Sequence, residues 1–202
     1  MKYSSLSGVA LLCASLLAAP VLASENAGNI TVGFSPSGTA LSNVLDVINS
    51  AHNSIDVAAY SFTSKEVAAA LVKAAGRGVQ VRVVADQKDN QKSPHSAVIT
   101  MQENNIPVRL DGHYAIMHNK FMVVDGVTTE TGSFNYTVSA DKRNAENALV
   151  IWNAPQLAAV YSQEFERLWQ ESSIPDATVT APHIKTPSAT SLRRSLSRWI
   201  TP

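Results

Sequence analysis

Cysteine is nearly missing from this chain of 202 residues, which contains only Cys13. Cys13 lies in an N-terminal stretch that we expect to be removed, so the mature chain would carry no thiol. A chain without thiols forms no disulfide and offers no cysteine ligand for zinc. Residues 10–12, Ala-Leu-Leu, also lack the small residue expected directly before a lipid-modified cysteine.

Long apolar runs are scarce as well. The run from Leu6 to Ala19 contains small and apolar residues, follows a basic Lys2 and ends before Pro20. A membrane anchor is one interpretation, but the run is short for a spanning helix and the proline interrupts it. We therefore expect residues 1–23 to be a secretory signal. Cleavage before Ser24 would leave a periplasmic or secreted protein with no stable membrane anchor.

The sequence shows little charge imbalance. Its 16 Lys and Arg residues match 16 Asp and Glu residues, for a net charge of zero. Lys2 contributes +1 and the segment after Ile174 contributes +3, which leaves −4 on residues 24–174. A net-acidic core excludes a protein that coats nucleic acid by bulk positive charge. Any affinity for phosphate must be local, or be helped by the basic C-terminal segment.

Apolar periodicity predicts an alternation of strands and helices along the chain. The expected order is strand 30–34, helix 39–51, strand 55–60, helix 65–75, strand 79–85, polar loop 87–93, helix 94–104, strands 108–110, 121–124, 127–131 and 148–152, and a closing helix 156–170. The strand-helix-strand order of the first half predicts an α/β fold. We expect a mixed, largely parallel central sheet with helices on both faces.

These elements predict a single domain over residues 24–171. Serine, threonine and proline become frequent over residues 172–202, and a basic segment lies at 192–200. We expect this tail to be flexible. A grip of the basic segment on DNA or on a membrane is the alternative.

The stretch His-Asn-Lys-Phe-Met-Val-Val-Asp from His118 to Asp125 is the most informative in the chain. Its apolar run ends at Asp-Gly, a hairpin-type turn pair, which predicts a strand that enters a tight turn. Because side chains alternate along a strand, His118 and Lys120 share one face and Asp125 points away from them. By the same rule Ser133 and Asn135 lie side by side. A histidine, a cation and two neutral hydrogen-bonding groups are suited to a phosphate.

The spacing of His118, Lys120 and Asp125, followed by Gly-Ser-Phe-Asn at 132–135, resembles the signature of the phospholipase D superfamily. A short chain with one motif and a secretion signal is most similar to the small secreted bacterial endonuclease branch. The likeness spans about residues 30–170 and includes Tyr60–Ser64, Arg77–Val79 and Glu146–Asn147. It implies the α/β/α sandwich of that superfamily. It also implies a site made of His118, Lys120, Asn135, Glu146, Ser133 and Asp125, in which Glu146 orients and charges the histidine and Ser133 assists.

The chain has no second copy of the full His-x-Lys-x-x-x-x-Asp motif. Phosphoryl displacement places the attacking and leaving oxygens in line, on opposite sides of phosphorus. One His118 attacks from one side and cannot also protonate the oxygen that leaves from the other. Imidazole suits both tasks, because its ordinary pKa is about 6.5. A two-fold symmetric homodimer would supply the second histidine.

The resulting hypothesis is a sequence-nonspecific endonuclease acting on DNA, with RNA as a further substrate. It works through a phosphohistidine and without a metal or cofactor, because Lys120 and Asn135 of both subunits hold the nonbridging oxygens. A phospholipase D-type lipid phosphodiesterase is the alternative, since the same chemistry serves any phosphodiester. A binding module with a dead site is disfavoured, because every catalytic position is filled.

The sequence allows two interpretations for several residues. Asp125 is in the signature but favours a structural role at the turn. Glu146 would otherwise be an ordinary strand-edge carboxylate, and His113 is an alternative acid within one chain. Asp86, at a strand end, suits either a function or a helix N-cap. Tyr60 and Phe62 are expected to pack the core, with stacking on a base as the alternative.

Overall fold

The computed structural model describes residues 29–175, so the expected signal at 1–23 and nearly all of the expected tail at 172–202 lie outside the described residues. The elements are β1 (Ile30–Ser35), α1 (Thr39–Asn49), β2 (Ser54–Ala59), α2 (Lys65–Gly76), β3 (Gln80–Asp86), α3 (Gln87–Asn90), α4 (Ala97–Glu103), β4 (Val108–Asp111), β5 (Lys120–Val124), β6 (Thr128–Gly132), α5 (Val138–Lys142), β7 (Glu146–Ile151) and α6 (Pro155–Glu171). None of these helices is long and apolar enough to cross a membrane.

The seven strands form one mixed sheet in the order β1-β7-β6-β5-β2-β3-β4. β2 pairs in parallel with β3, and β3 with β4, whereas the other four pairings are antiparallel. The expected α/β class and mixed sheet are confirmed, but the expectation that the sheet is largely parallel is wrong. The second half of the chain runs from β5 to β7 as an antiparallel meander, and β1 joins its outer edge.

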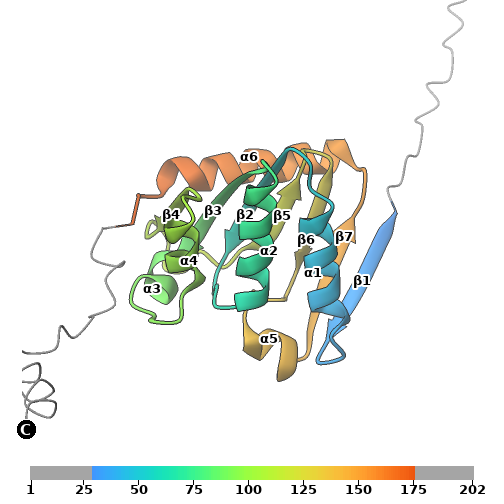
Figure 1. The fold of residues 1–202 in the computed structure, drawn as a ribbon, viewed down its shortest axis with the longest axis horizontal. Coiled ribbons are helices and arrows are strands. Elements are labelled where there is room, and N and C mark those ends of the chain that lie inside the picture. The colour runs from blue at the N-terminus through green and yellow to red at the C-terminus, as the bar shows by residue number, and fades with distance from the viewer. Residues whose placement is uncertain (1–28, 176–202) are drawn as a thin grey trace, which may run out of the picture.

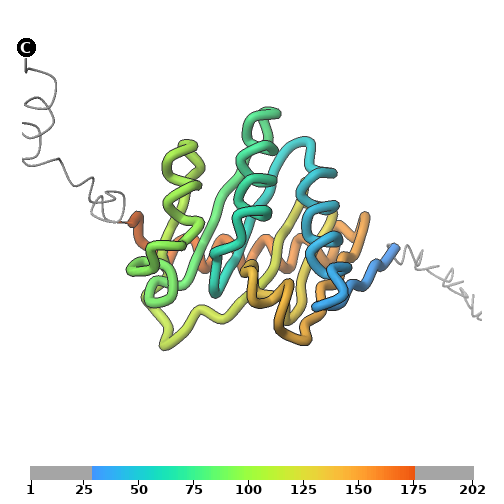
Figure 2. Tube along the Cα trace, turned by 60° about the horizontal axis from the view of Figure 1, so that its bottom comes forward, coloured from blue at the N-terminus to red at the C-terminus, as the bar shows by residue number. Residues whose placement is uncertain are grey.

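Helices cover both faces of this sheet. α1, α2 and α4 lie on one face, and α6 crosses the other face (Figure 1). Figure 2, turned about the horizontal axis, shows the three helices on one side of the strands and the orange α6 on the opposite side. The larger core lies under α1, α2 and α4, and a smaller core lies under α6. The molecule is therefore an α/β/α sandwich.

The alternation predicted for the motif strand is confirmed in β5. Met122 and Val124 belong to the larger core, whereas Phe121 and Val123 belong to the core under α6. The strand begins at Lys120, so His118 lies in the loop that precedes it.

Candidate active site

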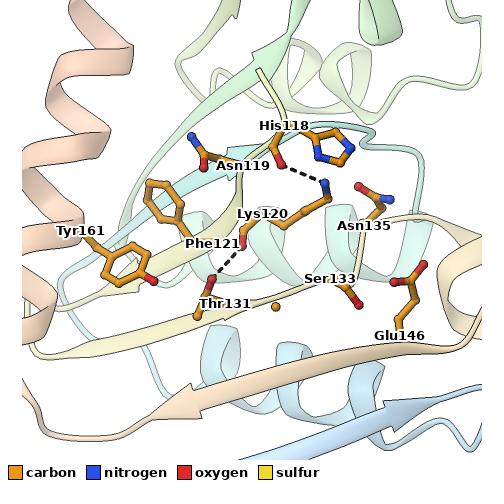
Figure 3. Close-up of a pocket in the computed structure, with 10 residues that line it drawn as sticks. His118, Asn119, Lys120, Phe121, Thr131, Ser133, Asn135, Glu146 and Tyr161 are labelled. Atoms are coloured by element: carbon orange, nitrogen blue, oxygen red, sulfur yellow. Dashed lines mark hydrogen bonds between the residues drawn. The ribbon is translucent and has the colours of Figure 1, made fainter. Parts of the chain in front are cut away.

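A pocket of about 530 Å³ opens where the loop before β5 meets the ends of β5, β6 and β7 (Figure 3). It is lined by His118, Asn119, Lys120, Phe121, Thr131, Gly132, Ser133, Asn135, Glu146 and Tyr161. The last of these comes from α6, which forms one wall. Five of the six residues predicted for the site, all except Asp125, therefore line one pocket.

His118 and Lys120 form the centre of this pocket. The Lys120 ammonium donates a hydrogen bond to the backbone oxygen of His118 at 2.8 Å, and the His118 ring is exposed at the surface. Figure 3 shows the ring, the ammonium and the Asn135 amide pointing toward one another. Burial lowers the pKa of Lys120 from its ordinary value, and the nearby Glu146 opposes part of that shift. The site thus holds a positioned cation beside an accessible imidazole.

The Tyr60 ring packs against the ring of His118. Its ring centroid lies 4.6 Å from that of His118, and the Lys120 ammonium lies 5.3 Å from the Tyr60 centroid. Phe62, by contrast, has no exposed surface and packs in the larger core. The core interpretation is therefore right for Phe62, whereas Tyr60 lies at the site.

The loop that presents His118 is anchored by Asp86, at the end of β3. This carboxylate is 1 % exposed. One oxygen accepts the backbone N–H of Met117 at 2.9 Å, and the other accepts that of Asp89 at 2.9 Å. Asp86 is the N-cap of α3, one of the two roles left open by the sequence. The same side chain also holds the residue next to the histidine.

Ser133 is fixed by a reciprocal pair of hydrogen bonds with Asn147 on β7. The Ser133 N–H donates to Asn147 Oδ1, and the Asn147 N–H donates to Ser133 Oγ, both at 3.0 Å. β6 and β7 approach so closely here that a Cβ atom on Gly132 would lie 2.3 Å from the Asn147 carbonyl oxygen. The Asn135 side-chain oxygen is buried and has no hydrogen-bond partner within residues 29–175. That amide oxygen is not committed to the protein.

Glu146 lies in the pocket but does not hold His118 in this single chain. Its Oε1 accepts a hydrogen bond from Asn144 Nδ2 at 2.9 Å, and its backbone N–H donates to Ser35 Oγ at 3.2 Å. No hydrogen bond joins it to His118 in the part of the chain that the structure describes. Figure 3 shows Glu146 on the far side of Asn135 from the histidine.

Asp125 lies outside the pocket, at the opposite end of β5. Its carboxylate accepts the backbone N–H groups of His52, Asn53 and Ser54 at 2.9, 2.6 and 2.8 Å. Burial alone would raise the pKa of Asp125, but these N–H donors outweigh it and the pKa falls below its ordinary value. The partners are two residues of the loop before β2 and the first residue of β2, rather than residues of the turn that follows Asp125.

Other expected candidates do not enter the site. His113 is not among the lining residues, and its ring packs edge-on against Tyr114 at 4.8 Å. Across residues 29–175 no cluster of three His, Cys, Asp or Glu side chains could hold a metal ion. Sequence reasoning also missed Thr131 and Tyr161. The alternation along β6 offers a signal for Thr131, whereas only the packing of α6 brings Tyr161 to the pocket.

Comparisons with known proteins agree on one family. The family described as "Cardiolipin synthase, PLD-like domain" matches residues 44–169. A phospholipase D of Rickettsia bellii is 38% identical over 67% of this chain and 67% of its own length. A mitochondrial cardiolipin hydrolase of Xenopus tropicalis is 37% identical over 66% of this chain and 62% of its own length.

Solved structures give the same result. Nuc of Salmonella typhimurium, a phospholipase D family member, is 40% identical with a TM-score of 0.70, over 72% of this chain and 97% of that one. NucT of Helicobacter pylori shares the fold at 23% identity and a TM-score of 0.65, over 72% and 98%. The fold and the pocket define a phosphodiesterase. More particularly, the chain belongs to the phospholipase D superfamily.

Proposed function

We propose that this phosphodiesterase is a sequence-nonspecific endonuclease that cleaves DNA, and also RNA, in the periplasm or outside the cell. The observation that carries this is the convergence of an exposed His118, the Lys120 ammonium and the Asn135 amide in one open pocket. Two solved relatives, named Nuc and NucT, support a nuclease, and the match covers nearly all of the first.

The proposed reaction has two steps. A His118 nitrogen attacks phosphorus, an N–P bond forms and the P–O bond to the leaving oxygen breaks, while the His118 of a second subunit gives that oxygen its proton. That second imidazole then takes a proton from water, whose oxygen attacks phosphorus and breaks the N–P bond. Lys120 and Asn135 hold the nonbridging oxygens throughout, so neither a metal nor a cofactor is needed.

The second histidine requires a homodimer. His118 is the only histidine that lines the pocket in the described part of the chain. A two-fold axis beside the pocket would bring a second copy of His118 opposite the first, so that one phosphate lies between them. Glu146 makes no hydrogen bond to His118 within residues 29–175, which fits a pairing of Glu146 with the histidine of the partner subunit.

An uncovered part of the sheet supports such a dimer. Ile30, Val32 and Phe34 project from β1 on the face that carries α6, and they are 58, 51 and 58 % exposed. Among the described residues 29–175, α6 packs on β2 to β6 and leaves this edge exposed. The bare edge is continuous with the pocket, because Val32 pairs with Leu149 and Thr131 pairs with the same residue. A second copy seated there would bury the apolar row and meet the pocket.

Placing a charge on the bare edge tests the dimer. Val32→Lys should give monomers in light scattering and lower the nicking rate by more than about tenfold, because lysine at an apolar interface loses its hydration. Val138→Lys is the matched control, since Val138 is similarly exposed, at 53 %, but belongs to α5 rather than to the apolar row on β1. It should remain dimeric and active. A strictly monomeric Val32→Lys protein with full activity would refute the shared site.

The substrate class needs a direct comparison, because curated relatives bear the names phospholipase D and mitochondrial cardiolipin hydrolase. A lipid phosphodiesterase is therefore the second candidate. The purified protein should nick plasmid DNA with EDTA present and leave cardiolipin vesicles intact. Lipid hydrolysis without nicking of DNA would make the lipid phosphodiesterase the leading candidate. Complete loss of nicking in EDTA would refute the metal-free mechanism.

A further inference from the structure

A carboxyl group that this mechanism does not use lies inside the protein, close behind the site. Glu130, in the middle of β6, has no exposed surface. Its cross-strand neighbours are Met122 on β5 and Val150 on β7, both fully buried. Its Oε2 accepts a hydrogen bond from the Tyr136 hydroxyl at 2.7 Å. Its Oε1 has no partner within residues 29–175. A buried polar group with an unmade hydrogen bond lowers stability, so stability does not account for a glutamate at this position.

Tyr136 connects this carboxyl to the site, because it directly follows Asn135. The Tyr136 side chain is fully buried, and its carbonyl oxygen accepts the N–H groups of Thr63 and Ser64 at 2.9 and 2.8 Å. Phe134, on the other side of Asn135, is 1 % exposed. Asn135 is thus held between two side chains fixed in the core. The hydroxyl of one of them is tied back to β6.

We propose that Glu130 is a positioning residue: its hydrogen bond to Tyr136 holds the segment that carries Ser133 and Asn135 against the pocket. The inference rests on the proposed function, in which Asn135 holds phosphate oxygens. A misplacement of about 1 Å in such a group costs up to roughly a hundredfold in rate. Loosening the segment should therefore lower kcat more than it changes KM.

The buried surroundings of Glu130 should make the activity depend on pH. Burial raises the pKa of Glu130 to about 8, and the hydrogen bond from Tyr136 opposes only part of that effect. Tyr136 is the one titratable group of the described residues that acts on it, because the neighbouring positions on β5 and β7 are Met122 and Val150. Above this pH the carboxylate could regain hydration only by opening the packing around Tyr136. Asn135 would then lose its placement.

Hydrolysis of bis(p-nitrophenyl) phosphate tests the inference, because this simple diester does not depend on whether nucleic acid or lipid is the natural substrate. Tyr136→Phe and Glu130→Leu each remove the hydrogen bond, and we expect kcat to fall about tenfold or more with little change in KM. Glu130→Gln keeps the acceptor but cannot ionise. It should match the wild type at pH 7 and keep its activity above pH 8, where the wild type declines.

Thr129→Val is the matched control. Thr129 is a neighbouring fully buried polar residue on β6, its hydroxyl has no partner within residues 29–175, and it has no link to Tyr136. Its kcat and pH profile should be unchanged. The inference is overturned if folded Tyr136→Phe and Glu130→Leu proteins keep kcat within twofold, or if the Glu130→Gln profile follows the wild type above pH 8.

One further variant separates this inference from the function on which it rests. Asn135→Ala should reduce kcat at least as far as Tyr136→Phe does. A fully active Asn135→Ala protein would refute the role of Asn135, and with it the proposed function of the segment. An inactive Asn135→Ala beside a fully active Tyr136→Phe would refute the positioning role of Glu130 alone.

Discussion

The Asp125 carboxylate accepts three backbone N–H groups from residues 52–54, at the start of β2. β2 and β5 are antiparallel neighbours, so these bonds fasten the start of one strand to the end of the other. The backbone of Asp125 has a φ of 54°, in the left-handed region that Asp and Asn tolerate better than other side chains. Asp125 therefore fixes the register of the strand whose opposite end carries Lys120.

Asp125→Asn should destabilise the fold while leaving the chemistry intact. The amide keeps the tolerated backbone conformation but turns an N–H₂ group toward the His52 N–H, so two donors face each other. We expect a loss of about 1–2 kcal/mol in the free energy of unfolding at pH 7. The kcat of the folded protein should be unchanged. Chemical denaturation measures the loss, and Asp46→Asn, on the exposed side of α1, is the control that should change nothing.

The pH dependence of this loss follows from the lowered pKa of Asp125. A depressed folded pKa adds stability above the unfolded value of about 3.9, and that stability disappears as pH falls through the folded pKa. The difference between wild type and Asp125→Asn should therefore shrink in acid. A difference that stays constant from pH 7 to pH 2 would contradict the assignment.

At the scale of single residues, the sequence predicted five polar members of the pocket but missed Thr131 and Tyr161. Alternation along β5 and the residue spacing were enough to group His118, Lys120, Ser133 and Asn135. Tyr161 could not be found this way, because its place depends on how α6 crosses the sheet. Glu130 was missed for a related reason, since only the burial of β6 on both faces makes its carboxyl unusual.

Among the elements, β6 is the most tightly constrained at the site. Gly132→Ala would place a methyl group 2.3 Å from the Asn147 carbonyl oxygen, which is backbone and cannot swing away. The strands must separate there, which should cost about 1–3 kcal/mol of stability. The paired bonds between Ser133 and Asn147 would break, so kcat should fall.

Gly76→Ala is the matched control for this substitution. It lies in helical backbone at the end of α2, and a Cβ atom there meets nothing within 4 Å. Thermal unfolding and the diester assay should show it neutral or slightly stabilised and fully active. Equal stability and activity of the two alanine variants would show that the close approach of β6 and β7 does not matter.

The long helices were predictable because their periodicity is strong, and the two shortest helices were not. α3 and α5 have four and five residues, too few to show a period, although Asp86 and Thr137 cap them. The parallel share of the sheet was overestimated for a different reason. Strand-helix-strand order runs from β1 to β4, but only β2, β3 and β4 pair in parallel, and nothing local shows that β1 would join β7 at the far edge.

The whole molecule is asymmetric in a way that suits a partner. Within residues 29–175, α1, α2 and α4 cover one face of the sheet, whereas α6 covers the other and leaves the β1 edge exposed (Figure 2). The pocket lies at the ends of β5, β6 and β7, and Thr131 and Tyr161 line it on the side of the sheet that carries α6. Within residues 29–175 the pocket thus holds one histidine, His118, and the sheet has one exposed apolar row, both of which a second copy would complete under two-fold symmetry.

A subunit-mixing experiment tests this whole-molecule property directly. If both imidazoles of a dimer act on one phosphate, a dimer with one wild-type chain and one His118→Asn chain is inactive. After denaturation and refolding of equal amounts, about a quarter of the dimers would contain two wild-type chains, so activity per wild-type chain should fall to about half. Wild-type protein refolded with Val138→Lys controls for refolding losses and should keep full activity. Activity that stays proportional to the wild-type chains present would mean that each subunit works alone, and the composite site would be wrong.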